Sequence, residues 1–483
     1  MTAATSTAGR YRQLIAGGVL LLAACTPAAT PDRPAAAPTT ASPAVAGIAP
    51  GEERSFPPAP DIATGPLADG TVELLDTVFG SVESTVNTDA IRDLGATGDA
   101  RVTWLLGDLL RFLPSGPNHD AAVAAFEQLT DTTVDDGDPW TVVTDRLIAW
   151  DLPAPPGYVG WKRQLYEVVE PGWEPFFADA DADIDWRLVS WGGVPIDDRP
   201  LAAIELPCPE GCIPALDDPA VTDADGGSWY PDHFVVFGVE VGGEARAYPK
   251  NIMEVHEMVN DTVGGRRIAM PYCTLCGSAQ AYLTDDVATS VDLDGTGSYE
   301  LRTTGLLSRS NKVMYEFHTK SVFDTFTGEA LSGPLHDAGV ELEQISVVTS
   351  RWGDWKRTHP DTTILAEDGG IGRDYPEDPL RGRDDGGPIF PIGDVDPRLP
   401  VQEQVVGVVS PDGTAVAFPA EAARTALDAG DDVTVGGVRL QVAAGGLNAT
   451  LADGTPVASH QAFWFAWSQF HPDTRLWTSA LGS

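Results

Sequence analysis

Two parts of the chain contain the same short elements in the same order. The elements of the first part lie at residues 245–249, 262–265 and 359–362, and their counterparts lie at 415–419, 434–437 and 471–474. Short strands and glycine turns that recur in order indicate two copies of one β-rich unit. We expect the second copy to be shorter, because it lacks most of the residues between Gly265 and Trp352.

The residues before these copies have the periodicity of helices. Apolar side chains at Val102, Leu105, Leu109 and Phe112 are three or four residues apart and share one helix face, and residues 120–129 repeat the pattern. From about residue 190 the pattern changes to short strands separated by glycine-rich turns. We therefore predict an α+β, multidomain chain, with an N-terminal helical region followed by a β-rich region that contains both copies.

The N-terminus has the features of a bacterial lipoprotein signal. Arg10 and Arg12 precede an apolar stretch at 14–24, which is too short to span a bilayer and ends at Cys25 in a Leu-Ala-Ala-Cys sequence. This sequence resembles the lipobox, whose cysteine becomes lipidated, and an ordinary cleaved signal peptide is the alternative. Residues 26–60 are rich in Ala, Pro and Thr and predict a disordered stalk, because they contain too few large apolar side chains to form a core.

These features define the expected organisation of the chain. We predict a signal peptide at 1–25, a stalk at 26–60, a helical region at 61–185, a first β-rich unit at 186–395 and a second at 396–483. We expect an extracytoplasmic protein, attached to the cell membrane through lipid on Cys25. The net charge of −41 argues against nucleic acid as a partner, because phosphate binding needs clustered Lys and Arg. The sequence identifies no protein partner.

Four cysteines follow Cys25. They allow three pairings, among which the sequence does not choose: Cys208 and Cys212 are expected to close a small disulfide loop in an oxidising compartment, or to pair with the other two cysteines. Cys273 and Cys276 form a Cys-x-x-Cys pair, a spacing that allows both sulfurs to converge on one metal ion or on each other. This pair has no counterpart in the second copy, so it belongs to the chemistry of the first copy rather than to a shared scaffold.

A short helix is expected around residues 251–259, with His256 on its apolar side. Aligned without gaps, His256 and Glu257 fall opposite Ala426 and Leu427 of the second copy. The histidine and the glutamate are therefore candidate site residues. A buried histidine that only hydrogen-bonds to a backbone carbonyl is the alternative for His256.

Three motifs of the first copy closely resemble those of a bacterial family, the domain of unknown function numbered 3179. The motifs are His256-Glu257 with Asn260-Asp261, Cys273-x-x-Cys276-Gly-Ser-Ala, and Ser310-Asn311-x-Val-Met314-Tyr315. The resemblance extends from about Ile204 to the C-terminus and implies no settled activity. The chain departs from the family pattern at Thr274, where proline is usual, and at Glu316-Phe317, where an Asp-Arg pair is usual.

These residues allow three functions, and they do not decide whether the chain is an enzyme. The first function is binding or handling of a soft metal, with copper as the best candidate, through Cys273, Cys276, His256 and Met314, because thiolate, thioether and imidazole favour soft ions. The second is thiol–disulfide chemistry, and the third is a ligand-binding module with structural disulfides. The supporting residues expected around the site are Glu257, Asn260, Asp261, Ser310, Asn311 and Tyr315. The sequence contains neither a nucleophile elbow nor a zinc-protease motif, and this argues against a hydrolase.

Overall fold

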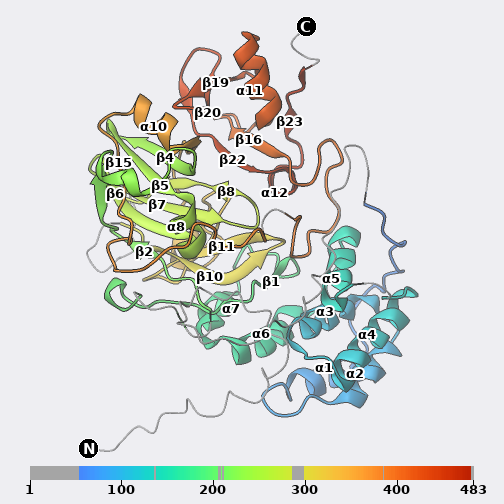
Figure 1. Ribbon diagram of the computed structural model, residues 1–483. Coiled ribbons are helices and arrows are strands. Elements are labelled where there is room, and N and C mark those ends of the chain that lie inside the picture. The colour runs from blue at the N-terminus through green and yellow to red at the C-terminus, as the bar shows by residue number, and fades with distance from the viewer. Residues whose placement is uncertain are drawn as a thin grey trace, which may run out of the picture.

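The computed structural model describes residues 54–134, 137–204, 208, 211–285, 298–383 and 386–479. The predicted signal peptide, Cys25 and most of the predicted stalk lie outside these residues. Within them, an N-terminal helical region is followed by a β-rich region, as the sequence predicts (Figure 1). No helix among the described residues is long and apolar enough to cross a membrane.

The helical region contains seven α-helices within the described residues. They are α1 (Asp69–Phe79), α2 (Thr88–Gly95), α3 (Thr103–Phe112), α4 (Pro117–Thr130), α5 (Pro139–Trp150), α6 (Tyr158–Val169) and α7 (Glu174–Ala178). Side-chain caps begin two of them, because the Asn87 carboxamide accepts from the Ala90 amide and the Asp138 carboxylate accepts from the Thr141 amide. The two helices predicted from apolar spacing correspond to α3 and α4.

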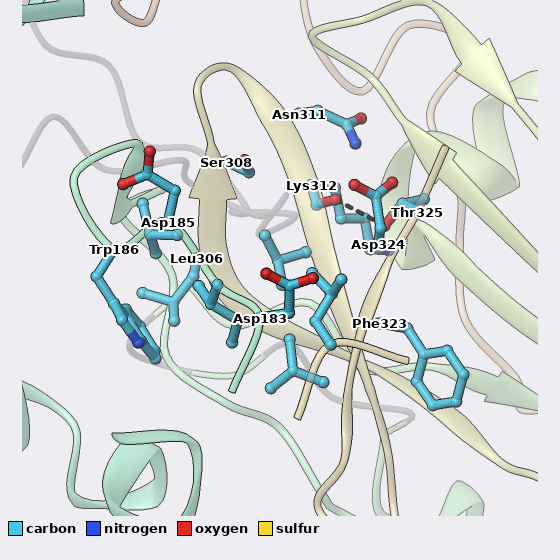
Figure 2. A pocket seen from close by; sticks show the side chains of 15 residues that line it. Asp183, Asp185, Trp186, Leu306, Ser308, Asn311, Lys312, Phe323, Asp324 and Thr325 are labelled. Atoms are coloured by element: carbon cyan, nitrogen blue, oxygen red, sulfur yellow. Dashed lines mark hydrogen bonds between the residues drawn. The ribbon is translucent and has the colours of Figure 1, made fainter. Parts of the chain in front are cut away.

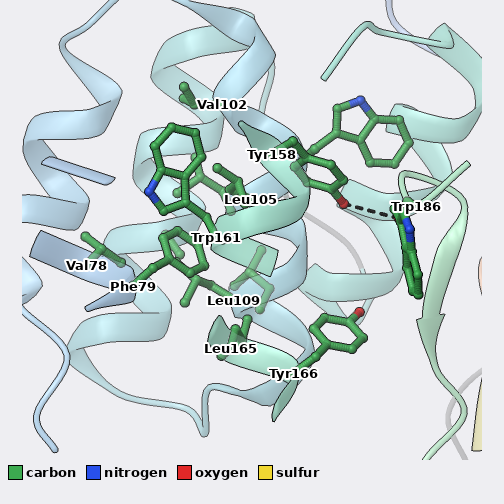
Figure 3. Close-up of a cluster of buried hydrophobic side chains, with 14 of the residues drawn as sticks. Val78, Phe79, Val102, Leu105, Leu109, Tyr158, Trp161, Leu165, Tyr166 and Trp186 are labelled. Carbon is green, nitrogen blue, oxygen red and sulfur yellow. Dashed lines mark hydrogen bonds between the residues drawn. The ribbon is translucent and has the colours of Figure 1, made fainter. Parts of the chain in front are cut away.

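The apolar faces of these helices form one core, which also contains residues of the β-rich region (Figure 3). Leu105 and Leu109 of α3 are fully buried in it, as the spacing of the sequence predicts. A buried lysine connects the core to the first strand. Lys162 Nζ donates to Asp108 Oδ1 at 2.7 Å and to the Val189 carbonyl at 2.6 Å. The helical region is therefore joined to the β-rich region by a buried polar contact as well as by apolar packing.

The described part of the β-rich region forms five small, blade-like sheets. Sheet 1 contains β1 (Val189–Trp191), β10 (Leu301–Ser308), β11 (Asn311–Glu316) and β12 (Val322–Asp324). Sheet 2 contains β13 (Gln344–Ile345), β9 (Ala281–Leu283), β7 (Arg266–Cys273), β6 (Met258–Val263) and β2 (Leu216–Asp217), with β8 (Ser278–Ala279) paired to β7. Sheet 3 contains β14 (Val348–Arg351), β4 (Val235–Val241), β5 (Glu244–Pro249), β15 (Thr363–Leu365) and β3 (Val221–Asp223).

The last two sheets come from the C-terminal part of the chain. Sheet 4 contains β22 (His460–Phe463), β16 (Gln404–Val409), β17 (Ala415–Pro419) and β23 (Arg475–Leu476). Sheet 5 contains β18 (Thr434–Val435), β19 (Val438–Ala443), β20 (Gly446–Leu451) and β21 (Pro456–Val457). The helices between strands are α8 (Lys250–His256), α9 (Gly333–Asp337), α10 (Trp352–Thr358), α11 (Ala420–Ala429) and α12 (Trp464–Phe470). An arrangement of five sheets does not by itself divide this region into two copies of one unit.

Sheets 3 and 4 nevertheless share local geometry at the repeated elements. Each has an antiparallel hairpin whose second strand also pairs with a parallel strand, β5 with β15 and β17 with β23. Trp355 Nε1 donates to Thr362 Oγ1 at 2.9 Å, and Trp467 Nε1 donates to Thr474 Oγ1 at 2.9 Å. These contacts explain why the tryptophan and the threonine of each repeated ending occur together.

Candidate functional site

The Cys-x-x-Cys loop is a tight turn between two paired strands. β7 ends at Cys273 and β8 begins at Ser278, and these two residues pair across the turn. The Cys276 amide donates to the Cys273 carbonyl at 3.2 Å, and Gly277 has a φ of 56°, a backbone conformation that favours glycine. Both thiols are free and buried, with 2% and 0% of each residue exposed, and their sulfur atoms are 2.9 Å apart.

The tip of the hairpin between β10 and β11 packs against this loop. Ser308 pairs with Asn311, which leaves a two-residue turn with Arg309 at a φ of 54°. The carbonyl oxygen of Ser310 is 3.3 Å from Cys276 Sγ and 3.8 Å from Cys273 Sγ. The Ser310 carbonyl is therefore an acceptor for the thiols.

A carboxylate and a lysine also lie at the loop. Glu257 follows α8 with a φ of 51°, and its Oε1 accepts a hydrogen bond of 2.9 Å from the Thr274 hydroxyl, between the two cysteines. Lys312 Nζ donates to the Glu257 backbone carbonyl. Lys312 is only 2% exposed, whereas Glu257 is half-buried. The loop thus has the carboxyl group of Glu257 and the amino group of Lys312 among its neighbours.

Burial perturbs the protonation of each of these groups. Burial raises the pKa of Glu257, although the nearby Lys312 ammonium opposes that rise. It lowers the pKa of Lys312 to about 8. It also raises the pKa of the Cys276 thiol well above its usual range, with a further contribution from the hydrogen bond to Cys273. Perturbed groups of opposite type around two thiols are typical of a functional site.

The structure does not assemble the predicted copper ligands. His256 is fully buried, but its Nδ1 lies 2.9 Å from the Pro214 carbonyl and its Nε2 lies 2.6 Å from the Tyr375 hydroxyl. Both ring nitrogens are therefore occupied by other groups. Within the described residues, the ligand atoms of His256, Cys273 and Cys276 do not all lie within 4.8 Å of one another. Burial lowers the pKa of His256 to about 3, so the ring is neutral.

Met314, the fourth predicted ligand, belongs to a different part of the core. It packs with Met258, Leu301 and other apolar residues between sheets 1 and 2, whereas the two cysteines lie in another apolar cluster. Met253 and Met270 lie in a third cluster. Methionines fill irregular gaps in cores because their side chains are unbranched. The concentration of methionine in the first copy reflects packing in this structure.

Asn260 and Asp261 connect strands rather than line the thiol loop. The Asn260 carboxamide donates to Asp217 Oδ1 at 2.8 Å, and its oxygen accepts from the Leu301 amide at 3.0 Å. The Asp261 carboxylate accepts from Arg246 Nη1 and from the Tyr248 hydroxyl, each at 2.7 Å. This motif therefore holds sheet 2 against its neighbouring sheets.

Tyr315, another predicted supporting residue, faces the helical region. Its ring packs on Phe176 with 5.1 Å between ring centroids, and its hydroxyl donates to Asp198. Side chains alternate between the two faces of a strand, so Tyr315 and the adjacent Met314 of β11 face opposite sides of the sheet. Met314 faces the core between sheets 1 and 2, whereas Tyr315 faces the core of the helical region.

Several buried polar groups flank the thiol loop without a hydrogen-bond partner among the described residues. They are Ser278 Oγ, both amide atoms of Gln280, Ser310 Oγ, Asn311 Oδ1 and Gln404 Oε1. Gln280 follows β8 and Gln404 begins β16, beside Gly277. Unpaired buried groups are costly and in native proteins call for a functional or solvent explanation. The predicted residues Ser310 and Asn311 therefore stay candidates for the site.

The C-terminal sheets form one wall of this site. The Phe463 amide donates to the Cys276 carbonyl at 2.8 Å, so β22 is connected directly to the loop. Both cysteines pack in an apolar cluster with Trp464 and Trp467 of α12. Figure 1 shows β22 and α12 beside β8. The C-terminal part of the chain, which has no Cys-x-x-Cys pair of its own, thus covers Cys273 and Cys276.

A pocket of about 160 Å³ lies along the half of the same hairpin that is nearest its tip (Figure 2). Asp183 and Asp185 line it from the segment before β1, and Asn311 and Lys312 line it from β11. Asp324 of β12 also lines the pocket, and burial raises the pKa of its carboxyl group. Neither cysteine lines this pocket.

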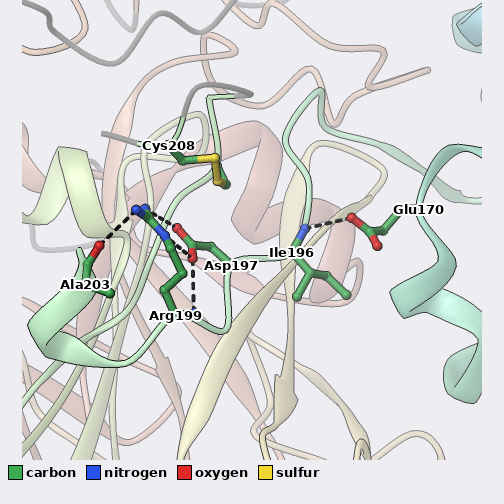
Figure 4. Close-up of a disulfide and its surroundings, with 7 residues drawn as sticks. Glu170, Ile196, Asp197, Arg199, Ala203 and Cys208 are labelled. Atoms are coloured by element: carbon green, nitrogen blue, oxygen red, sulfur yellow. Dashed lines mark hydrogen bonds and ion pairs between the residues drawn. A yellow bond between two sulfur atoms is a disulfide. The ribbon is translucent and has the colours of Figure 1, made fainter. Parts of the chain in front are cut away.

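Cys208 and Cys212 form a disulfide with their Cα atoms 5.5 Å apart, one of the pairings that the sequence allows (Figure 4). Asp197 lies beside this disulfide and is paired with Arg199, with 2.7 Å between Asp197 Oδ2 and Arg199 Nη2. The loop leads to Pro214, whose carbonyl contacts His256. The disulfide therefore stabilises the segment that holds the histidine.

Comparison with known proteins identifies the family of the chain. Residues 210–453 match the model of a family described as protein of unknown function (DUF3179). The chain belongs to this family. No curated protein and no solved structure matches the chain. In this DUF3179 protein the matched residues include the thiol loop, Glu257 and the β10–β11 hairpin.

Sequence reasoning missed Lys312 and treated Thr274 only as a departure from the family pattern. Lys312 stands at the position that the Ser-Asn-x-Val-Met-Tyr motif leaves open, so the motif provides no signal for it. A signal existed in the strand itself. Lys312 and Met314 are two residues apart, so a strand that buries one also directs the other to the same face.

Proposed function

We propose that the protein is a thiol–disulfide redox protein whose reacting pair is Cys273 and Cys276. The observation that supports this function best is the sulfur–sulfur distance of 2.9 Å inside a buried turn. A disulfide requires about 2.05 Å, so small side-chain rotations would close the bond. Two thiolates on one tetrahedral ion are about 3.8 Å apart, which the present spacing does not match.

The geometry favours this function over the copper site expected from the sequence. The copper site expected from the sequence places His256 and Met314 beside the sulfurs, and both side chains are engaged elsewhere. A structural disulfide, the other alternative, requires no acid or base beside it. The Glu257 carboxylate and the Lys312 ammonium at the loop are therefore better explained by a pair that changes its redox state.

We propose that the protein works outside the cytoplasm, anchored to a membrane through Cys25. The residues that support this are the apolar stretch at 14–24 and the Leu-Ala-Ala-Cys sequence that ends it. The Cys208–Cys212 disulfide is a second support, because such bonds persist in oxidising compartments. A thiol pair in that compartment would meet disulfide-bonded proteins and small disulfides as reaction partners.

We also infer that the β-rich region arose from two copies of one unit. Support comes from the matched hairpins and parallel strands of sheets 3 and 4, and from the matched tryptophan–threonine hydrogen bonds. In this inference sheet 2 of the first copy is equivalent to sheet 5 of the second. The strands β10, β11 and β12 are then an insertion, because they lie in the chain between β9 and β13 of sheet 2. In this interpretation one copy kept the thiol chemistry and the other became its cover.

The redox function is tested by equilibrating the full chain with mixtures of reduced and oxidised glutathione. Free thiols are then alkylated, and the peptide containing residues 273–276 is quantified by mass spectrometry. We expect the oxidised fraction of Cys273 and Cys276 to change reversibly with the glutathione ratio while the protein stays folded. The double variant Cys208→Ser/Cys212→Ser is the matched control and should retain this titration.

Two results would reject the function. A pair that is reduced only after the protein unfolds would identify a structural disulfide. A pair that stays reduced in oxidised glutathione, and binds one equivalent of Cu(I) by elemental analysis, would identify the metal site instead.

A further inference from the structure

Lys312 is a buried cation with no close ion pair among the described residues, although the Glu257 carboxylate acts on it from a greater distance. Its side chain is 2% exposed, and no ion pair within 4.0 Å includes it, whereas Lys162, the other fully buried lysine, is paired with Asp108. Its Nζ donates a hydrogen bond to the Glu257 backbone carbonyl. Burying an ammonium group is costly unless a negative charge compensates it. A negative charge that forms during a reaction at the neighbouring thiols would provide that compensation.

The charges around the loop differ between the two cysteines. Burial lowers the pKa of Lys312, and the Glu257 carboxylate and then Cys273 act against that lowering. Burial raises the pKa of the Cys276 thiol, and the hydrogen bond to Cys273 and the Glu257 carboxylate raise it further. Cys276 also lies closer than Cys273 to the Ser310 carbonyl, an acceptor that favours a protonated thiol. Both observations favour Cys276 as the thiol that stays protonated, which leaves Cys273 as the candidate attacking thiol.

Glu257 is held over the loop by local structure. The Thr274 hydroxyl donates to its Oε1, and the left-handed backbone at Glu257 turns the chain from α8 toward β6. Such a conformation is unfavourable for a residue other than glycine and occurs often at functional sites. Leu275 and Gly277, on either side of Cys276, are half-buried, as Glu257 is, so this is a part of the loop that solvent reaches.

We propose that Cys273 is the attacking thiol, that Lys312 stabilises its thiolate, and that Glu257 accepts its proton. This inference rests on the proposed redox function. The reaction partner is a disulfide, R–S–S–R, either small or at a protein surface. The proposal assigns Lys312 an electrostatic role and Glu257 the role of a base.

The reaction is balanced in two steps. Cys273 transfers its proton to the Glu257 carboxylate, and the thiolate attacks one sulfur of the partner. The partner disulfide breaks, a Cys273–S–S–R bond forms, and the leaving thiolate takes the proton from Glu257. Cys276 then attacks the Cys273 sulfur and its proton passes to the leaving thiolate, which forms the Cys273–Cys276 disulfide and releases the second thiol. Two thiols are oxidised and one disulfide is reduced.

The first test separates the roles of the cysteines without changing Lys312. The full chain with Cys276→Ser and the matched chain with Cys273→Ser are mixed with oxidised glutathione at pH 7. We expect the Cys276→Ser chain to accumulate a glutathione adduct on Cys273 at least tenfold faster than the Cys273→Ser chain forms one on Cys276. Equal rates, or a faster adduct on Cys276, would overturn the assignment.

The second test measures the ionisation of Cys273 in the Cys276→Ser chain. The rate of alkylation by iodoacetamide is followed against pH, with Lys312→Met, Lys312→Arg and Glu257→Gln added in turn. We expect Lys312→Met to move the profile up by about one pH unit, which reduces the alkylation rate at pH 7 about tenfold, and Lys312→Arg to restore most of it. Lys356→Met, at a lysine paired with Asp232 on the surface, is the matched control and should leave the profile unchanged.

Glu257→Gln gives a signature that a structural role would not produce. Loss of a negative charge should move the alkylation profile down, whereas loss of the base should slow glutathione exchange severalfold in the chain that retains both cysteines. An unchanged profile in Lys312→Met, in a chain with normal circular dichroism, would overturn the role of Lys312. If Lys312→Met does not fold, Lys312→Gln is measured in its place against the same criterion.

Failure of this inference differs from failure of the proposed function. If the unmodified chain does not titrate with glutathione, the redox function is wrong. If it titrates normally but the variants show no preference for Cys273 and no dependence on Lys312, only the present assignment is wrong.

Discussion

The Cys276 sulfur lies 3.3 Å from the backbone carbonyl oxygen of Ser310, at the tip of the hairpin between β10 and β11. This contact connects the thiol loop to the β10–β11 hairpin of sheet 1. The same tip contacts the segment directly before β1, because the Arg309 amide donates to the Leu188 carbonyl at 2.7 Å. The hairpin tip is thus the element through which a change at the sulfurs would reach the rest of the molecule.

Oxidation of the pair should loosen this hairpin tip. A disulfide between Cys273 and Cys276 has no S–H group, so the Ser310 carbonyl would lose its thiol donors. We expect amide hydrogen exchange in residues 306–313 to be severalfold faster in the oxidised protein than in the reduced protein, as measured by mass spectrometry. The hairpin between β16 and β17 is the control. Equal exchange in both redox states would contradict the proposed coupling.

His256 should make the protein less stable in acid. The pKa of this ring is about 3 in the folded protein, below the ordinary value of 6.5, so the unfolded chain binds more protons as the pH falls below 6.5. As the pH falls from 8 to 5, protonation of this histidine in the unfolded chain should lower the free energy of unfolding by about 2 kcal/mol. Urea unfolding of His256→Asn should show a weaker loss between these pH values. Buried His460 and His471, whose pKa values are lowered to about 3 and about 4, should keep part of the acid sensitivity.

Removing the buried carboxylate of Asp261 should destabilise the fold without changing thiol chemistry. Asp261→Asn leaves the buried Arg246 paired with Glu244 but beside a neutral amide, so we expect a cost below about 3–5 kcal/mol, the cost of losing the whole partner of a buried pair. The measurement is urea unfolding, combined with the alkylation rate of Cys273 in the folded state. Asp218→Asn, at a carboxylate exposed at the end of β2, is the control. A normal stability with altered thiol reactivity would show that Asp261 belongs to the site.

The inferred duplication predicts equal effects at two glycines. A Cβ atom at Gly238 would overlap the Trp355 ring, and a Cβ atom at Gly407 would overlap the Trp467 ring. Alanine at either position should therefore cost about 1–3 kcal/mol of unfolding free energy, the range for an overpacked core. Gly160→Ala, where nothing lies within 4 Å of the added atom, is the control and should not destabilise the protein. Tolerance of alanine at one site alone would argue against equivalent units.

Cys25→Ser should release the protein from membranes. The residue precedes the Ala-, Pro- and Thr-rich segment at 26–60 and lies outside the described residues, so the change should not alter the folded domains. The measurement compares the membrane and soluble fractions after cell lysis, with circular dichroism as the control for folding. A variant that stays with the membranes through salt washing would show that Cys25 is not the anchor.

Local patterns in the sequence determined the order of the main elements. Apolar residues three or four apart in residues 102–112 and 120–129 were enough to predict α3 and α4, because helix faces depend on spacing alone. Glycine turns and alternating residues predicted the hairpins in the same way. The Cys208–Cys212 disulfide is one of the pairings that the sequence left open. Comparison of the repeated segments directed attention to the Cys-x-x-Cys loop.

Only the tertiary structure decided which side chains surround that loop. His256 is adjacent in sequence to Glu257, yet the left-handed turn after α8 directs the ring to Pro214 and Tyr375 and the carboxylate to Thr274. Lys312 reaches the loop from a strand 36 residues beyond Cys276. The sequence by itself determined the thiol pair and its turn, because those depend on local spacing. The charges that act on the pair come from separate sheets, and their positions depend on packing between distant segments, which no local pattern encodes.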